Sequence, residues 1–156
     1  MGEIPPVSLV LTEKSIPHRI FRHPGPVRSL EQAAEERGQS PDQIVRSIVF
    51  RLGEGEFLMV LIAGASQISW QTLRAYLRQS RLTMASEKEV LEATGYRPGA
   101  VSPFGLPSPM RILADRNIFL PEEISVGSGE RGVTIILKSK DLKMALGEVE
   151  TGQFTP

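Results

Sequence analysis

The chain has 156 residues, of which 40% are hydrophobic and 23% are charged, and this is the size and composition of a single globular domain. Its 18 lysines and arginines balance its 18 aspartates and glutamates, so any polyanion must be bound by a local basic patch rather than by a global field. The lack of cysteine excludes disulfides, thiolate nucleophiles and cysteine zinc sites.

Helix boundaries are marked by proline, by serine caps and by glycine. A first helix is expected over residues 7–14, because Ile16 precedes Pro17 and the residue before proline disfavours the helical backbone. Ser29 and Gln32 match a capping box, which opens a helix that Gly38 closes. The same signals predict a helix start at Ser40 and helices over 70–79 after Ser69, 87–94 between Ser86 and Gly95, and 140–146 between Ser139 and Gly147.

Strands are predicted between these helices. Residues 44–52 mix β-branched and polar residues, and a turn at 53–56 leads into the apolar run 57–63, so the two segments form a hairpin whose second strand is buried on both faces. Shorter strands are expected over 110–114, 123–126 and 133–138. Because strands and helices do not alternate regularly, the pattern predicts an α+β or mixed α/β protein, built on a mixed sheet or barrel flanked by helices, rather than a doubly wound sheet.

A glycine-rich segment at 127–132 has the spacing of a dinucleotide-binding fingerprint. That fingerprint requires a helix after the glycines, but residues 133–137 are β-branched and strand-like. We therefore expect a hairpin turn with positive φ angles here.

Other chemistry-bearing residues have structural interpretations. His18 and His23 lie five apart in a predicted strand and point to opposite faces, so we expect no metal site and no cofactor. A serine hydrolase elbow of the Gly-x-Ser-x-Gly type is absent. Arg74, Arg78 and Arg81 share one helical face, for which a solvated surface is favoured over a phosphate site.

The most unusual segment is 95–109, which contains three glycines and four prolines. No helix or central strand tolerates this composition, so the segment is predicted to be an ordered loop. Several of its main-chain N–H groups can face one side and receive an oxyanion or a phosphate. From composition alone, a rigid surface connection is an equally good interpretation.

This loop is one of several landmarks that follow each other along the chain. They are the Gly-Tyr-x-x-Gly-x-Val-Ser-Pro-Phe-Gly sequence at 95–105, the Ser-Pro-Asp-Gln-Ile-Val lead into a strand at 40–45, the strand 44–50, and the segments 112–115 and 126–129. Together they make residues 7–148 resemble the YbaK-like editing domains associated with prolyl-tRNA synthetase. The resemblance implies an α+β fold with a mixed β-barrel-like sheet surrounded by short helices. It also implies a free-standing deacylase that hydrolyses a mischarged aminoacyl-tRNA, with a small amino acid on tRNA-Pro as the expected substrate.

The resemblance further implies the residues of the site. Main-chain N–H groups of Gly95 and Gly99 would form the oxyanion site, and Arg46 would anchor a phosphate or carbonyl of the tRNA acceptor end. The other substrate-binding residues that it implies are Phe21, His23, Ser47, Tyr96, Val101, Ser102, Pro103, Phe104, Gly105, Asp115, Gly127 and Gly129. Ser102 is expected to position groups rather than to act as a nucleophile, and for Asp115 a structural role in a turn is an equally good interpretation.

One residue departs from the family pattern. The family usually carries a lysine where this chain has Arg46, which keeps the positive charge and can contact phosphate through two N–H groups but cannot act as a base. Because the chain offers neither a cysteine nor an evident serine nucleophile, we expect water to attack the ester and the substrate to supply the activating group. The resemblance implies that this group is the free ribose hydroxyl of the terminal adenosine.

Two other functions stay open at this point. The chain could be a non-catalytic RNA-binding or nucleotide-binding module of the same fold, or a hydrolase of a small ester or amide unrelated to tRNA. Binding through several phosphates weakens steeply with salt, whereas a small-molecule hydrolase is nearly indifferent to salt.

The expected partners are aminoacyl-tRNA, through its acceptor end, and prolyl-tRNA synthetase. No apolar run reaches the length of a membrane span, and residues 1–8 lack the basic and apolar parts of a signal peptide. We therefore expect no membrane partner, a cytoplasmic location and one editing domain that spans residues 1–156.

Overall fold

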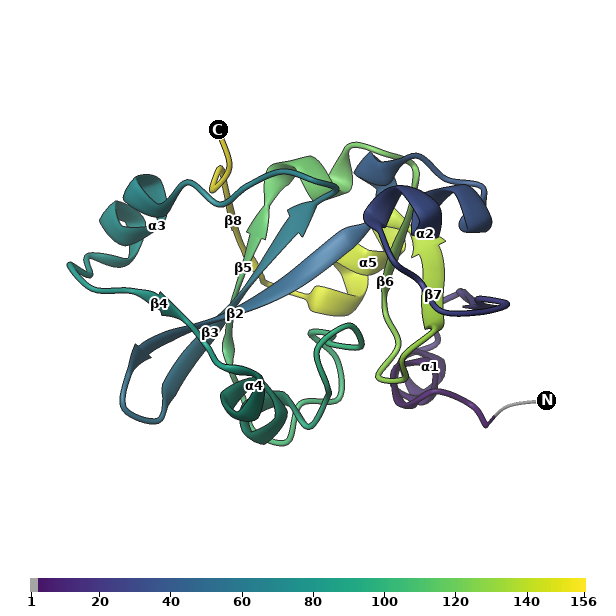
Figure 1. The fold of residues 1–156 in the computed structure, drawn as a ribbon, viewed down its shortest axis with the longest axis horizontal. Helices are drawn as coiled ribbons and strands as arrows, with labels where there is room; N and C mark the ends of the chain where they lie inside the picture. The colour runs from purple at the N-terminus through teal and green to yellow at the C-terminus, as the bar shows by residue number, and fades with distance from the viewer. Residues whose placement is uncertain (1–2) are drawn as a thin grey trace.

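A computed structural model describes residues 3–156 as five α-helices and eight strands (Figure 1). The helices are α1 (Pro6–Glu13), α2 (Leu30–Arg37), α3 (Trp70–Leu77), α4 (Glu87–Thr94) and α5 (Ser139–Leu146), with short 3-10 helices η1 (Pro41–Gln43) and η2 (Arg116–Phe119). The strands are β1 (Arg19–Arg22), β2 (Val45–Gly53), β3 (Glu56–Ala63), β4 (Thr83–Met84), β5 (Arg111–Asp115), β6 (Glu123–Gly127), β7 (Val133–Lys138) and β8 (Glu150–Gly152). Within the same residues, every helix is too short or too polar to cross a membrane.

The strands form two sheets. One has the order β4-β2-β3-β5-β8 and combines antiparallel with parallel pairs, and the other has the antiparallel order β1-β7-β6. A bridge between Ile44 and Ser125 joins β6 to the start of β2. The predicted α+β class is therefore confirmed, while the sheets of residues 3–156 stay separate and do not close into a barrel, because this bridge is not continued into a ladder.

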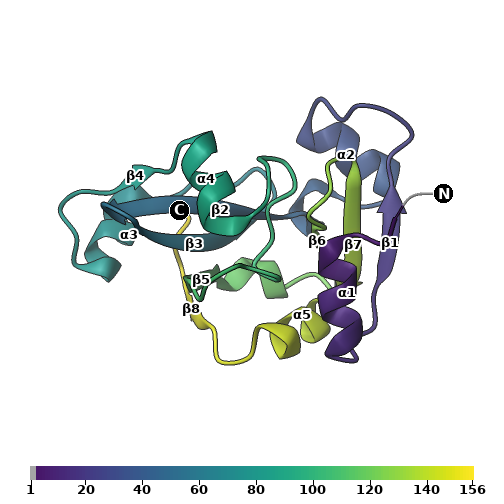
Figure 2. The ribbon, with the colours of Figure 1, turned by 90° about the horizontal axis from the view of Figure 1, so that it is seen from below.

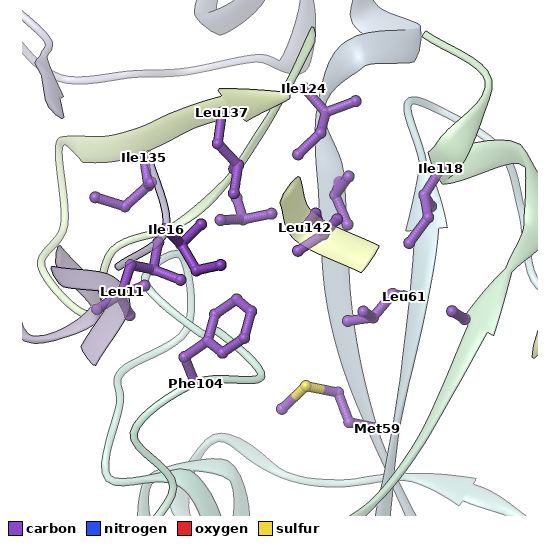
Figure 3. Close-up of a cluster of buried hydrophobic side chains, with 14 of the residues drawn as sticks. Leu11, Ile16, Met59, Leu61, Phe104, Ile118, Ile124, Ile135, Leu137 and Leu142 are labelled. Atoms are coloured by element: carbon purple, nitrogen blue, oxygen red, sulfur yellow. The ribbon is translucent and has the colours of Figure 1, made fainter. Parts of the chain in front are cut away.

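The main hydrophobic core lies between the two sheets. Figure 3 shows side chains from α1, β3, β7 and α5 that meet in this space, among them Leu11, Leu61, Leu137 and Leu142. A second cluster fills the opposite face of the larger sheet, under α3, and includes Val60 and Leu73. Alternate residues of β3 contribute to the two clusters, so this strand is buried on both faces as predicted.

The predicted strands and the glycine turn are confirmed. β2 and β3 form the expected antiparallel hairpin, and β5, β6 and β7 lie within one residue of their predicted limits. Gly129 and Gly132 have φ values of +89° and +78° in the turn between β6 and β7, which is a hairpin and not a nucleotide-binding loop. The short strands β4 and β8 were not predicted, because two or three residues carry no period that can be recognised.

The helix predictions hold at most boundaries. Ser29 Oγ accepts from the Gln32 N–H and Ser86 forms a complete capping box with Glu89, while Gly38 and Gly95 end their helices with positive φ. The helix start at Ser40 is only the three-residue η1.

Two serine caps were predicted wrongly. Ser69 Oγ donates to Thr72 Oγ1 at 2.8 Å, and Ser139 Oγ donates to Glu122 O at 3.4 Å. Neither hydroxyl therefore caps a main-chain N–H. The helix after Ser69 ends at Leu77, two residues early, because Arg78 adopts a left-handed conformation with a φ of +56°.

Asp115 anchors the C-terminal segment to the end of β5. Its carboxylate is fully buried, and Oδ2 accepts from Phe154 N–H at 2.8 Å, from Thr155 N–H at 3.1 Å and from Thr155 Oγ1 at 2.9 Å. Oδ1 accepts from Asn117 N–H at 3.0 Å. Phe154 is thereby held in the cluster under α3, so the structure supports the structural interpretation of Asp115.

Replacing Asp115 with alanine should destabilise the fold. The change leaves these donors without an acceptor in a buried place, and because one such group costs about 1–3 kcal/mol we expect the free energy of unfolding to fall by at least about 2 kcal/mol. Urea unfolding measures the loss. Glu148→Ala, at an exposed position, is the control and should stay within about 0.5 kcal/mol of the parent; an equal effect of the two changes would contradict the anchoring role.

Candidate active site

A cavity lies along the outer edge of β2, against the loop that follows α4. Its volume is about 440 Å³, within the range of roughly 300–1,000 Å³ that is usual for small-molecule sites. Figures 1 and 2 show this loop between the two sheets. The walls come from α2, β2, β4, α4, the loop, β6 and β7. The residues that line the cavity are, in chain order, Arg37, Ile44, Val45, Arg46, Ser47, Ile48, Val49, Met84, Ala85, Glu87, Val90, Pro98, Gly99, Val101, Gly127 and Thr134.

The edge of β2 supplies main-chain groups to this cavity. β4 pairs with β2 only at Phe50 and Arg51, and beyond them Ala85 N–H donates to Val49 O at 3.0 Å. Alternate residues of a strand direct their main-chain groups to opposite sides. Ser47, two residues before Val49, therefore directs its N–H and C=O away from β3, toward the open edge.

The side chain of Ser47 adds an unusual polar group. Its Oγ is buried, and no hydrogen-bond partner for it is found within residues 3–156. Buried polar groups of native proteins are nearly always hydrogen-bonded. This oxygen is closed off from solvent, so in this conformation it lies within the wall and is not in contact with the open cavity.

The glycine-rich loop contributes a tight turn. Ala100 N–H donates to Arg97 O at 2.9 Å and Gly99 has a φ of +91°, and proline followed by a glycine of positive φ is the sequence of a type II turn. No hydrogen bond formed within residues 3–156 uses the N–H of Gly99 or of Val101. Two donors on the cavity wall are thus available to a ligand.

Gly95 lies outside the cavity. It ends α4 with a φ of +79°, and its N–H donates to Leu91 O at 2.9 Å. This N–H is already used as a helix cap. The unused N–H groups on the cavity wall are therefore those of Gly99 and Val101, and not those of Gly95 and Gly99 as predicted.

Tyr96 supports the loop from the side away from the cavity. Its ring is buried, its hydroxyl donates to Phe104 O at 2.6 Å, and burial raises its pKa. A Cβ at Gly105 or Gly129 would overlap this ring, so both glycines permit close packing on it. Gly129 N–H also donates to Ala100 O at 3.0 Å. Tyr96 therefore fixes the shape of the loop without lining the cavity.

Arg46 brings a positive charge to the cavity edge. Its Nε donates to Gly64 O at 2.7 Å and its Nη2 donates to Ser66 O at 2.5 Å, so the side chain also holds the loop that follows β3. Burial lowers the pKa of the guanidinium. A guanidinium nevertheless keeps its proton in proteins at neutral pH.

The two histidines occupy different environments. His18 lies between Ser8 Oγ at 2.7 Å and Ile16 O at 2.8 Å, whereas His23 contacts Glu36 and Arg37. Among the described residues, no group of three His, Asp or Glu side chains could hold a metal ion.

Five of the residues predicted for the site meet on the cavity wall: Arg46, Ser47, Gly99, Val101 and Gly127. The others lie away from it, and they are Phe21, His23, Gly95, Tyr96, Ser102, Pro103, Phe104, Gly105, Asp115 and Gly129. Ser102 is fully buried and its Oγ accepts from Phe104 N–H at 3.2 Å, which is a loop-shaping contact.

Several wall residues were not predicted, notably Arg37, Met84, Glu87, Val90 and Thr134. The Pro98-Gly99 pair is a turn signal that could have pointed to the second half of the loop as the part that faces a ligand. Nothing local marks Arg37, since its Ser125 partner is 88 residues away.

Comparisons with known proteins agree on one family. Residues 24–145 match the aminoacyl-tRNA editing domain. The chain is 36% identical over 123 residues to a proline–tRNA ligase of Kosmotoga olearia, covering 79% of this chain and 20% of that protein, and 36% identical over 105 residues to one of Thermosipho africanus, covering 67% and 18%. It thus spans about a fifth of these relatives.

A solved structure shows the same fold. It belongs to a protein with a proposed role as a trans-editing enzyme for prolyl tRNA synthetase, and it matches with a TM-score of 0.86 and 24% identity over 97% of this chain and 95% of that chain.

Gly127→Ala should displace the loop. A Cβ at Gly127 would overlap Val101 O, so we expect a loss of about 1–3 kcal/mol in the free energy of unfolding from overpacking. The amide resonances of Gly99 and Val101 should shift in ¹⁵N NMR spectra. Gly25→Ala is the matched control, because nothing lies within 4 Å of its Cβ position; resonances that move equally in both variants would show that Gly127 does not shape the wall.

Proposed function

This chain belongs to the aminoacyl-tRNA editing domain family, and we propose that it is a deacylase that hydrolyses the ester between an amino acid and the terminal adenosine of a mischarged tRNA. One observation carries the proposal. A cavity of suitable size combines two unused main-chain N–H groups, from Gly99 and Val101, with a positive charge at Arg46. These are groups that bind a polarised carbonyl and its substituents without taking part in covalent chemistry.

The proposed substrate is a small amino acid mischarged on tRNA-Pro. The proposed tRNA follows from relatives with 36% sequence identity, which are proline–tRNA ligases. The proposed size of the amino acid follows from the cavity, whose volume of about 440 Å³ must hold part of the adenosine as well. Large aminoacyl side chains would then compete for the same space. The prolyl-tRNA synthetase is accordingly the proposed partner, and the cytoplasm is the proposed location.

The proposed mechanism uses water as the nucleophile. The cavity wall carries Ser47 but no histidine, lysine or aspartate, and its one carboxylate, Glu87, forms no hydrogen bond with the Ser47 hydroxyl. Water attacks the ester carbonyl carbon, and the free ribose hydroxyl beside the ester relays a proton from that water to the ribose oxygen that leaves. The carbon–oxygen bond to the ribose breaks, and the products are the free amino acid and the uncharged tRNA.

Gly99 and Val101 are proposed to stabilise the negative charge that develops on the carbonyl oxygen. One donor of this kind contributes about 3 kcal/mol to the transition state. Their main-chain positions are fixed from behind by Tyr96 and by the contact of Gly129 with Ala100, so little reorganisation is needed during the reaction.

Residues 1–156 are proposed to act as a single editing domain. The support is the fold of the solved trans-editing structure, which this chain covers over 95% of its length.

The purified protein should deacylate at least one aminoacyl-tRNA, with alanyl or seryl tRNA-Pro as first candidates. The measurement is release of radiolabelled amino acid across a panel of mischarged tRNAs, with and without EDTA, and we expect EDTA to leave the rate unchanged. Correctly charged prolyl-tRNA-Pro is the control substrate. If no substrate is hydrolysed faster than it decays spontaneously, the deacylase proposal fails. Salt-dependent tRNA binding would then favour a binding module.

Arg46→Ala should lower the hydrolysis rate at least about tenfold, since hydrogen bonds to charged groups contribute about 1.5–3 kcal/mol. Arg46→Lys keeps the charge and should retain most of the activity. Because Arg46 also holds Gly64 and Ser66, thermal unfolding must be measured alongside the rate. The exposed Arg28→Ala serves as the control; a folded Arg46→Ala variant with the parent's rate would remove this residue from the site.

A further inference from the structure

Arg37 is a second cation on the cavity wall, and the proposed reaction does not use it. It is the last residue of α2, its Nε donates to His23 Nε2 at 3.0 Å, and its Nη1 donates to Ser125 Oγ at 2.9 Å. A guanidinium has five N–H donors, so these two hydrogen bonds leave three N–H groups without a partner among the described residues.

The charge of Arg37 lacks an anionic partner. Within residues 3–156, ion pairs closer than 4.0 Å join Arg19, Arg22, Arg51 and Arg111 to glutamates, and none includes Arg37. Its hydrogen bonds go to an imidazole and a hydroxyl, and the side chain is half-buried. Burial lowers its pKa to about 10, and the charge of Glu36, which lies beyond ion-pair distance, offsets this lowering only in part. Charges taken out of water are normally paired, so this guanidinium is placed for an anion that comes from outside the chain.

The orientation of Arg37 is fixed by a chain of hydrogen bonds. His23 Nδ1 lies 2.6 Å from Glu36 Oε1, and Gln32 Nε2 donates to Glu36 Oε2 at 2.9 Å. Because His23 Nε2 accepts from Arg37, the imidazole is neutral and its proton sits on Nδ1, where it is donated to Glu36. The His23 side chain is only 1% exposed. Glu36 and His23 therefore hold Arg37 as a positioned group rather than a mobile surface side chain.

We propose that Arg37 is the anion-recognition residue of the cavity, and that its free N–H groups bind an anionic oxygen group of the substrate. That group is either a phosphate of the RNA end or a carboxylate on the aminoacyl side chain, both of which accept two hydrogen bonds from a guanidinium. Among the charged residues that line the cavity, one is acidic, Glu87, and two are basic, Arg37 and Arg46. The identity of the substrate rests on the proposed function, whereas the anion site does not.

The anion site can be tested without any aminoacyl-tRNA. Inorganic phosphate is titrated into the ¹⁵N-labelled protein, and resonances of the Arg37 Nε and the Gly127 amide report binding. Arg37→Gln keeps a polar side chain for Ser125, and Arg37→Met removes all donors; at least one of them should fold. Arg81→Met, at an exposed position outside the cavity, removes the same charge as a control.

We expect phosphate to bind the parent and Arg81→Met alike, and at least about tenfold more weakly to the Arg37 variants, because charged hydrogen bonds are lost. His23→Gln can still bridge Arg37 and Glu36 and should retain binding, while His23→Leu should weaken it. Equal phosphate affinity in the parent and the Arg37 variants, or no phosphate binding by the parent, would overturn the proposal.

Three non-hydrolysable amide analogues identify the source of the anion: alanyl-adenosine, alanyl-adenosine 5′-phosphate and aspartyl-adenosine. Arg37→Gln should weaken either the phosphorylated or the aspartyl analogue by about 10- to 100-fold and leave unchanged the binding of alanyl-adenosine, which carries no anionic group. A uniform loss over the three would show a structural role and overturn the proposal. Deacylation by the parent is measured in parallel. Phosphate binding through Arg37 without deacylation would refute the proposed function alone, whereas deacylation with Arg37-independent phosphate binding would refute the anion site alone.

Discussion

The antiparallel ladder between β2 and β3 is the interaction on which the rest of the structure depends. It runs from the Val45–Ala63 pair to the Arg51–Phe57 pair, and it places β3 between two hydrophobic clusters, so that both faces of this strand contribute to burial. With β3 paired on its other side to β5, β2 is left toward the edge of the sheet, and β4 covers only Phe50 and Arg51. The uncovered part of β2 is the floor of the cavity. The same ladder thus stabilises the core and creates the site.

The site is made largely from main-chain groups, which changes how it can be tuned. The N–H of Gly99 lies within the type II turn and that of Val101 follows the turn, and no hydrogen bond within the described residues uses either. Gly127 and Gly129 let the β6–β7 turn pack closely against the loop. Residues that do not face the cavity, above all Tyr96 and Ser102, hold these groups in place. Main-chain donors are insensitive to side-chain identity, so the specificity of such a site depends on the shape of its walls, here Met84, Val90 and Thr134.

The charges of the chain are distributed unevenly even though they cancel in sum. Four surface arginines form ion pairs with glutamates, as Arg111 does with Glu150 at 2.7 Å, and such exposed pairs contribute little to stability. The two cavity arginines instead contact carbonyl oxygens, a neutral imidazole and a hydroxyl. Their positive charge is therefore not compensated by an ion pair. A neutral protein thereby presents a local cationic pocket, which is the arrangement that a balanced composition requires of any protein that binds an anion.

The sequence by itself determined the elements and the family. Helix ends were marked by Ser29, Ser86, Gly38 and Gly95, because capping is decided within four residues. The apolar run of β3 predicted a strand that is buried on both faces. The sequence did not predict the short strands β4 and β8 or the separation into two sheets, and it wrongly predicted caps at Ser69 and Ser139. Each of these features depends on partners elsewhere in the chain. The site divided in the same way, because the glycine loop was visible locally. Only the tertiary structure showed that Gly99 and Val101 line the cavity and Gly95 does not, that Asp115 binds residues 39 and 40 positions away, and that Arg37 meets Ser125 across 88 residues. Contacts of that sequence separation are fixed by the packing of sheets and helices, and no short-range pattern encodes them.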